Sequence, residues 1–164
     1  MSQENNPTPE TPTYKLVITR EFEASPELVW EAWTEPEQIK EWLGLGEDST
    51  IESVKVDLRI GGKFRIQMKM EDGEYFTVAG TYLDVKAPER LAYTWDWEKD
   101  GSGTEFGELE GNETLVSVEL LASGSRTQLK LTHEKFASEE SRDRHIGGWN
   151  RWIDRTGKFL ETKG

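Results

Sequence analysis

The sequence of 164 residues contains no cysteine, which excludes disulfide bonds and thiolate chemistry. It contains only two histidines, His133 and His145, which lie far apart in the chain and lack the spacing of metal ligands. The aspartates and glutamates show no metal-binding spacing either. We therefore expect no metal site and no cofactor.

The sequence also lacks a long apolar run, and residues 1–13 are polar and rich in proline. Neither feature is typical of a signal peptide or a membrane span, so we expect a soluble, cytoplasmic protein without membrane insertion. The formal net charge is -12, whereas nucleic acids and anionic lipid surfaces attract basic proteins. We expect neither of them as a main partner.

Common enzyme motifs are missing as well: no P-loop, dinucleotide-binding fingerprint or nucleophile elbow occurs. The best candidate for a catalytic base is His133, on the inward side of its predicted strand, but the sequence nominates no partner to position it. Arg20, on the apolar face of the first predicted strand, is a candidate pocket-lining residue and the second residue considered for a role in an enzyme. We favour a packed or hydrogen-bonded His133 and an ion-paired Arg20, and we assign no catalytic residue.

Tryptophan, in contrast, is abundant, with seven residues in the chain. Aromatic side chains usually fill a hydrophobic core, and they also line apolar binding pockets. Both interpretations stay open at this point.

The stretch from residue 138 to 163 predicts one long amphipathic helix. Its apolar face carries Ile146, Trp149, Ile153 and Leu160 at helical spacing, and Ser138 is a plausible N-cap. Glycines interrupt this pattern on the apolar side or its margin, and each costs about 1 kcal/mol relative to alanine. They predict a bend, a close backbone approach or an empty space beneath the helix.

The remaining chain predicts a disordered tail at 1–13 and a single domain at 14–163. Within the domain, alternating apolar residues predict strands, and serine or proline starts predict two short helices after the first strand. Residues 98–113 are acidic and glycine-rich, which is typical of a mobile loop. The fold class is therefore α+β, with a curved antiparallel sheet that grips the last helix.

Several short motifs in this order resemble the START-like (SRPBCC) superfamily, and more closely its branch named after the activator of heat-shock-protein-ninety ATPase. The resemblance spans about residues 14–162 and is carried by Arg20-Glu21-Phe22, Ala24-Ser25-Pro26-Glu27 with Val29-Trp30, Thr34-Glu35-Pro36-Glu37 with Trp42, Asp57-Leu58-Arg59-Ile60-Gly61-Gly62, Pro88-Glu89-Arg90-Leu91 with Thr94-Trp95, Thr127 with Leu129 to Glu134, and Gly148-Trp149. It implies a helix-grip fold with a cavity between the sheet and the last helix. It implies activity less well, because relatives include lipid and hormone binders, aromatase/cyclases, stress-related proteins and chaperone activators.

We therefore expect non-enzymatic binding of a small hydrophobic or aromatic ligand in that cavity. The alternatives are a cochaperone-like or stress-related protein-interaction domain with chaperone contact, and a polyketide aromatase/cyclase-type enzyme. A filled core at the same place is an equally good interpretation of these residues. The predicted ligand-binding residues are Trp42, Phe64, Ile66, Met68, Phe76, Val78, Trp95, Trp97, His133, Trp149 and Ile153.

Overall fold

The computed structural model describes residues 13–44, 49–98 and 113–163. Most of the predicted 1–13 tail and of the predicted 98–113 loop lies outside the described residues. Seven strands form one antiparallel sheet in the order β1-β7-β6-β5-β4-β3-β2, so that the first strand pairs with the last. The strands are β1 Tyr14–Phe22, β2 Ser49–Val56, β3 Lys63–Met70, β4 Tyr75–Lys86, β5 Arg90–Trp97, β6 Thr114–Ser123 and β7 Arg126–Phe136.

Three helices complete the fold: α1 Pro26–Thr34, α2 Pro36–Leu43 and α3 Glu139–Glu161. Both predicted serine caps are confirmed, because Ser25 Oγ accepts from Leu28 N at 3.3 Å and Ser138 Oγ accepts from Ser141 N at 3.1 Å. A serine oxygen in this position satisfies one of the free N–H groups at a helix start. None of the helices in the described part of the chain is long and apolar enough to cross a membrane.

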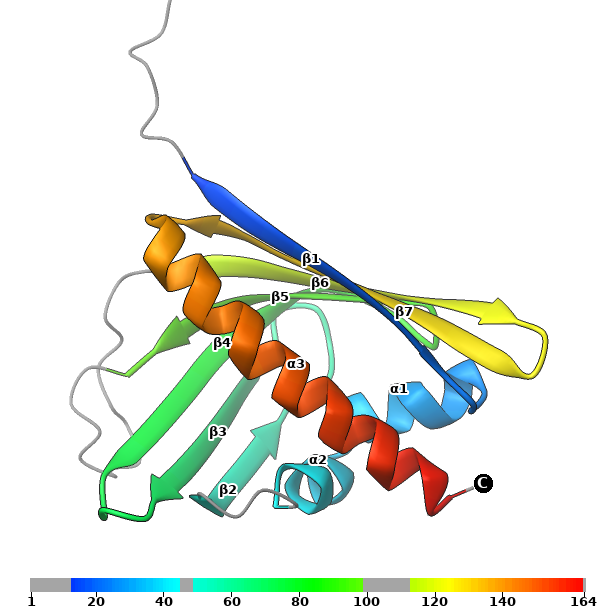
Figure 1. Ribbon diagram of the computed structural model, residues 1–164, viewed down its shortest axis with the longest axis horizontal. Coiled ribbons are helices and arrows are strands. Elements are labelled where there is room, and N and C mark those ends of the chain that lie inside the picture. The colour runs from blue at the N-terminus through cyan, green and yellow to red at the C-terminus, as the bar shows by residue number, and fades with distance from the viewer. Residues whose placement is uncertain (1–12, 45–48, 99–112, 164) are drawn as a thin grey trace, which may run out of the picture.

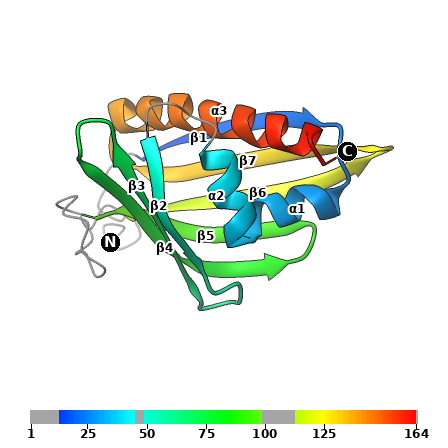
Figure 2. The same ribbon diagram turned by 90° about the horizontal axis from the view of Figure 1, so that it is seen from below.

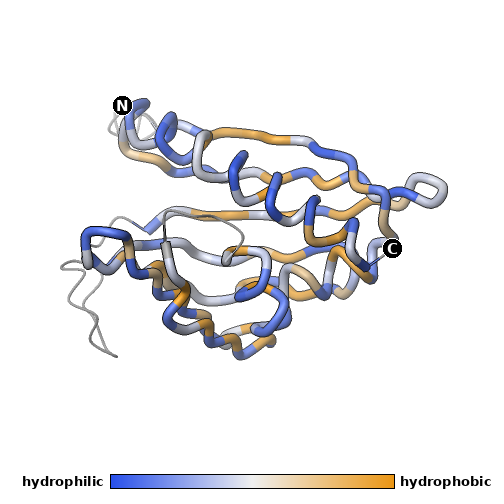
Figure 3. Tube along the Cα trace, turned by 60° about the horizontal axis from the view of Figure 1, so that its bottom comes forward, coloured by the Kyte–Doolittle hydropathy of each residue, from blue (hydrophilic) through white to orange (hydrophobic). Residues whose placement is uncertain are grey.

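The long helix α3 lies across the concave side of the sheet, as Figure 1 shows. Its backbone comes close to β1 and β7 and to α1 and α2, which Figure 2 shows packed beside it at one end of the sheet. The hydropathy colours alternate along its turns in Figure 3, as an amphipathic helix requires. The predicted α+β helix-grip arrangement is therefore confirmed.

The strand patterns place most predicted inward residues in the core, with two corrections. Phe76, predicted to face inward, is 46% exposed because it lies near the start of β4, in the part of the β3–β4 hairpin that extends beyond α3 (Figure 1). The alternation of β3, with Phe64, Ile66 and Met68 inward, predicts that Gln67 faces solvent. It is instead buried on the other face of the sheet, where its amide donates to Thr77 Oγ1 at 3.4 Å.

Gly80 in β4 predicts a bulge or bend, and the structure shows a close approach instead. A Cβ at this position would lie 1.8 Å from Thr94 O and 2.6 Å from a ring carbon of Phe64, its partner across β3. The irregularity of β4 lies further along, between Tyr82 and Asp84. Gly80 thus lets the Phe64 ring pack against the sheet on the side that faces α3.

Candidate functional site

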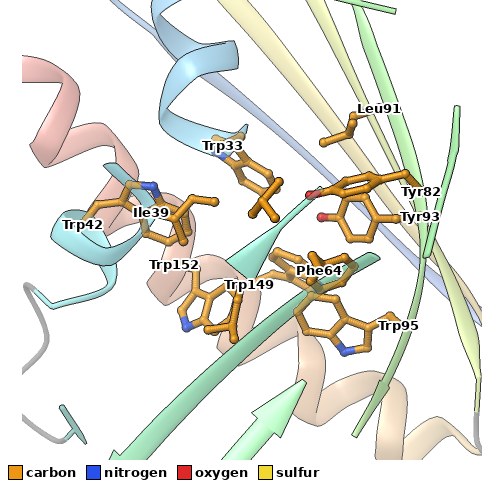
Figure 4. Close-up of a pocket in the computed structure, with 12 residues that line it drawn as sticks. Trp33, Ile39, Trp42, Phe64, Tyr82, Leu91, Tyr93, Trp95, Trp149 and Trp152 are labelled. Atoms are coloured by element: carbon orange, nitrogen blue, oxygen red, sulfur yellow. The ribbon is translucent and has the colours of Figure 1, made fainter. Parts of the chain in front are cut away.

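A small cavity lies between the sheet and the helices, and its walls are almost entirely aromatic or aliphatic (Figure 4). Its volume is about 40 Å³. That is enough for a water molecule, whereas a cavity that accepts benzene measures about 150 Å³. The lining residues are Trp33, Ile39, Trp42, Val56, Phe64, Ile66, Tyr82, Leu91, Tyr93, Trp95, Trp149 and Trp152.

Tryptophan rings from four different elements meet at this cavity. Trp33 of α1 stacks on Trp149 of α3, with ring centroids 5.8 Å apart and planes at 12°. Trp149 also packs against Trp95 of β5 at 4.8 Å, and Trp33 against Trp42 of α2 at 6.0 Å. The excess of tryptophan in the sequence is therefore concentrated where the helices face the sheet.

The structure brings together only part of the predicted ligand-binding set. Trp42, Phe64, Ile66, Trp95 and Trp149 line the cavity. The others lie elsewhere: Met68, Val78 and Ile153 are buried outside the lining, His133 is buried behind Trp149, Trp97 is half-buried at the end of β5, and Phe76 is exposed.

Several lining residues were missed at the sequence level. Tyr82, Leu91 and Tyr93 alternate on inward strand positions and could have been found from that signal. Helical spacing puts Trp152 on the flank of the apolar face of α3, and so it was not among the predicted ligand-binding residues. The contribution of α1 and α2 depends on how these helices fold back over the sheet, which no local pattern encodes. The missed residues are Trp33, Ile39, Val56, Tyr82, Leu91, Tyr93 and Trp152.

The indole N–H groups around the cavity differ in their hydrogen bonding. Trp42 Nε1 donates to Ala32 O at 2.7 Å, Trp149 Nε1 donates to His133 Nδ1 at 2.9 Å, and Trp97 Nε1 donates to His145 Nε2 at 3.2 Å. Among the described residues, the buried Nε1 atoms of Trp33 and Trp95 have no hydrogen-bond partner. A buried donor without a partner costs about 1–3 kcal/mol, so these two positions require an explanation.

Two phenol groups add polarity at one end of the cavity. The hydroxyls of Tyr82 and Tyr93 lie close together and point from the sheet towards Trp33 (Figure 4). Burial raises the pKa of Tyr82 and of Tyr93, and the neighbouring Tyr82 raises that of Tyr93 further. Both phenols therefore stay protonated, and each offers a neutral O–H group.

His133 is fully buried, and both of its ring nitrogens are engaged. Nδ1 accepts from Trp149, which places the proton on Nε2, and Nε2 donates to Thr114 Oγ1 at 2.7 Å. The Thr114 hydroxyl in turn donates to Trp95 O at 3.0 Å. Burial lowers the pKa of His133 to about 2, with nearby His145 as a smaller cause. The ring has no free lone pair for a substrate, so its role is the structural one that we favoured.

His145 is held in the same way at the first turns of α3. Its Nε2 accepts from Trp97, so its Nδ1 carries the proton and donates to Ser141 O at 2.8 Å. Burial lowers its pKa, the bond to Ser141 acts against that shift, and the charge of Arg144 adds to it. Both histidines are therefore neutral hydrogen-bonding groups.

Arg20 forms the ion pair that the sequence favoured. Its Nη1 lies 2.5 Å from Asp154 Oδ1, and its Nη2 donates to Asn150 Oδ1 at 3.0 Å. Both partners lie on α3, so this contact ties β1 to the long helix and leaves Arg20 outside the cavity lining. In the described ranges no group of three or more His, Asp or Glu side chains is placed to hold a metal ion.

Gly148 sits one turn before Trp152 on α3 and has open space beside it. A Cβ at Gly148 would meet no atom within 4 Å apart from its chain neighbours and the helix backbone. Trp152 is only half-buried, and its ring meets Trp42 and Trp95 edge-on at 5.9 Å each. Of the three alternatives predicted for these glycines, a close backbone approach is absent at Gly148, and Gly148 is not among the residues that line the cavity.

The fold and this cavity define a helix-grip domain with an aromatic site beneath its last helix. The family model described as "Activator of Hsp90 ATPase homolog 1-like protein" matches residues 23–161, and the chain belongs to that family. The START-like (SRPBCC) resemblance, in the same branch, is thereby confirmed. A search of curated proteins gave no match.

Solved structures with the same fold come from several bacteria. The AHSA1-like protein of Aeromonas hydrophila is 26% identical, with a TM-score of 0.73 over 92% of this chain and 94% of that one. CalU16 of Micromonospora echinospora is 27% identical, with a TM-score of 0.65 over 90% of this chain and 76% of that one. The AHSA1 protein of Silicibacter pomeroyi, at 23% identity, has a TM-score of 0.79 over 92% of this chain and all of that one, and shows the fold alone.

Proposed function

We propose that this protein binds a small aromatic molecule, without chemical conversion, in the cavity beneath α3. The observation that carries the proposal is the pairing of an aromatic cavity with the empty space at Gly148 beside a half-buried Trp152. A core that served stability alone would gain about 1 kcal/mol from alanine at a helical glycine and would leave no void. This protein instead has glycine at position 148 and a cavity beneath α3.

Rotation of the Trp152 side chain supplies the space that a ligand needs. The cavity of about 40 Å³ is smaller than a benzene site, so one wall must move for an aromatic ring to enter. A helical side chain leans towards the helix N-terminus and covers the positions three and four residues earlier, which for Trp152 include Gly148. The indole of Trp152 can therefore rotate over Gly148 and open the cavity.

The test uses ethylbenzene as the probe and the substitutions Gly148→Leu and Gly148→Ala. We expect saturable chemical-shift changes at Trp149 and Trp152 in the wild type, because the ring enters beside them. Leucine at Gly148 fills the space that Trp152 needs, so binding should weaken more than tenfold while the free energy of unfolding changes by less than about 1 kcal/mol.

Alanine at Gly148 is the matched control, because its methyl group meets nothing and leaves room for the indole. It should keep binding and add slightly to stability. A wild type that shows no saturable shifts would contradict the proposal. So would a Gly148→Leu variant that unfolds, because the space would then belong to the packed core.

The family description gives a second candidate, contact with a chaperone of the Hsp90 class. It supports a cochaperone-like role by membership alone, and the aromatic cavity has no part in it. Measuring the chaperone's ATPase rate with and without this protein separates the two ideas. An unchanged rate at saturating protein would remove the second candidate.

The cyclase-type candidate has lost the residues on which it was based. His133 uses both ring nitrogens for Trp149 and Thr114, and Arg20 is paired with Asp154. No specific feature of the site favours this candidate over ligand binding.

A further inference from the structure

Two tyrosine hydroxyls at one end of the cavity constrain the chemistry of a ligand. Tyr82 of β4 and Tyr93 of β5 lie directly opposite each other in the sheet, and both rings line the cavity. The two residues are only 3% and 6% exposed. Within the described part of the chain, neither hydroxyl forms a hydrogen bond. A buried hydroxyl normally has a partner, so this pair requires an explanation.

The two rings are held in place by their neighbours. Phe64 of β3 packs against Tyr82 with ring centroids 5.6 Å apart and meets Tyr93 edge-on at 5.1 Å. The tyrosine rings meet each other edge-on at 5.9 Å. Figure 4 shows both oxygens directed away from the sheet towards Trp33, which also lines the cavity. The hydroxyls thus lie close together at defined positions.

These hydroxyls differ from the unpaired indole donors of the same lining. The Nε1 atoms of Trp33 and Trp95 are closed off by the atoms around them, so a molecule in the cavity does not reach them. The oxygens of Tyr82 and Tyr93 are not closed off in this way. The phenols, and not those indoles, are therefore the polar groups that a ligand can meet.

The lining offers these hydroxyls and no charged residue. A charged ligand group would have to leave water without a counter-ion to meet it, which is costly. A hydrocarbon would cover both hydroxyls without giving either a partner, which also costs free energy. A tyrosine hydroxyl can donate and accept. A hydroxyl group on the ligand can do the same, so it can accept from one tyrosine and donate to the other.

We infer that the ligand is a phenol-type molecule, an aromatic ring whose hydroxyl group is bound by the hydroxyls of Tyr82 and Tyr93. Its ring packs among the tryptophans. This inference rests on the proposed function, because the cavity must open for the ring to enter. A water molecule is the competing occupant, since about 40 Å³ is enough for it. If water kept its place at the two hydroxyls, they would not distinguish one ring from another.

The experiment compares p-cresol with p-xylene, which have the same shape and differ in one hydroxyl group. Dissociation constants for both are measured on the wild type and on the variants Tyr82→Phe and Tyr93→Phe, which keep the ring and lose the hydroxyl. At least one variant should bind p-cresol about tenfold more weakly, the equivalent of one hydrogen bond. The same variant should bind p-xylene within about twofold of the wild type.

Tyr75→Phe is the matched control, because Tyr75 also lies on β4 and is not among the lining residues. It should leave both dissociation constants within about twofold of the wild type. Urea denaturation of all three variants adds a second readout. Removing an unpaired buried hydroxyl should leave the midpoint for Tyr82→Phe and Tyr93→Phe unchanged or raise it.

The outcomes separate this inference from the proposed function. If p-xylene binds the wild type and neither variant weakens p-cresol more than p-xylene, the inference is overturned and the proposed function stands. Clearly lowered urea midpoints for both variants also overturn the inference, because the hydroxyls would then serve the fold. If neither probe binds the wild type, the proposed function itself fails.

Discussion

Two neighbouring regions of the aromatic cluster differ in the hydrogen bonding of their buried polar atoms. Around the first half of α3, the N–H of Trp149 and the hydroxyl of Thr114 both find partners through His133, and Trp97 finds one in His145. At the cavity, the N–H groups of Trp33 and Trp95 have none among the described residues. The difference lies in hydrogen bonding, since all four tryptophan rings pack closely against other aromatic rings.

This contrast indicates which part of the cluster is core and which part is a candidate site. A buried polar group that serves the fold is normally paired, because leaving it unpaired costs stability. The region around His133 follows that rule and fixes α3 on the sheet. Trp33 and Trp95 in the cavity lining depart from it, whereas Trp42 and Trp149 in the same lining follow it, and departures of this kind are expected at binding sites.

The largest effect is expected when the paired region is broken by His133→Ala. The change leaves the Trp149 N–H without its acceptor and creates a void at a fully buried position. Together these should lower the free energy of unfolding by about 3–5 kcal/mol, measured by urea denaturation.

His145→Ala is the control for that measurement. Its ring is only half-buried, so Trp97 can reach water once the acceptor is lost. It should cost less than half as much as His133→Ala. Equal losses for the two variants would show that the buried network around His133 does not hold α3 in place.

Lowering the pH should destabilise the same region to a smaller extent than His133→Ala. The pKa of His133 is lowered to about 2 in the folded protein, against about 6.5 for an unfolded histidine. The unfolded state therefore binds the proton first, so stability is full above pH 6.5 and falls as the pH drops below it. Between pH 6.5 and 5.5 the loss from His133 should be about 1 kcal/mol, measured by urea denaturation.

His133→Gln provides the reference for this pH series, because glutamine does not titrate in that range. The free energy of unfolding should therefore fall less between pH 6.5 and 5.5 in this variant than in the wild type. If the free energy of unfolding depends on pH equally in the wild type and the variant, protonation of His133 does not cause the loss of stability in acid.

Much of the fold could be predicted from local signals. Ser25 and Ser138 mark helix starts, and the alternation of Val116, Val118 and Leu120 marks a buried strand face, as the structure confirms. The inward placement predicted for Phe76 was wrong. Alternation shows on which face of the sheet a side chain lies, but it does not show how far the helices extend over that face.

The site was harder to predict, because it depends on contacts between distant elements. Trp33 meets Trp149 only because α1 folds back onto α3, and no residue spacing in the sequence encodes that packing. Whether an indole N–H has a partner is also a property of the folded structure: Trp42 and Trp95 look alike in the sequence and differ in this respect. The glycine at 148 was a usable signal, and it marked an open space.

The most direct measurement follows the indole N–H resonances of the tryptophans in a ¹H–¹⁵N spectrum while ethylbenzene is added. The account predicts saturable shifts of the Trp149 and Trp152 resonances, because the ring enters beside them, smaller shifts for Trp97, which lies outside the cavity lining, and loss of these shifts in the Gly148→Leu variant. Trp149 and Trp152 resonances that stay unmoved at saturating ethylbenzene would contradict the account.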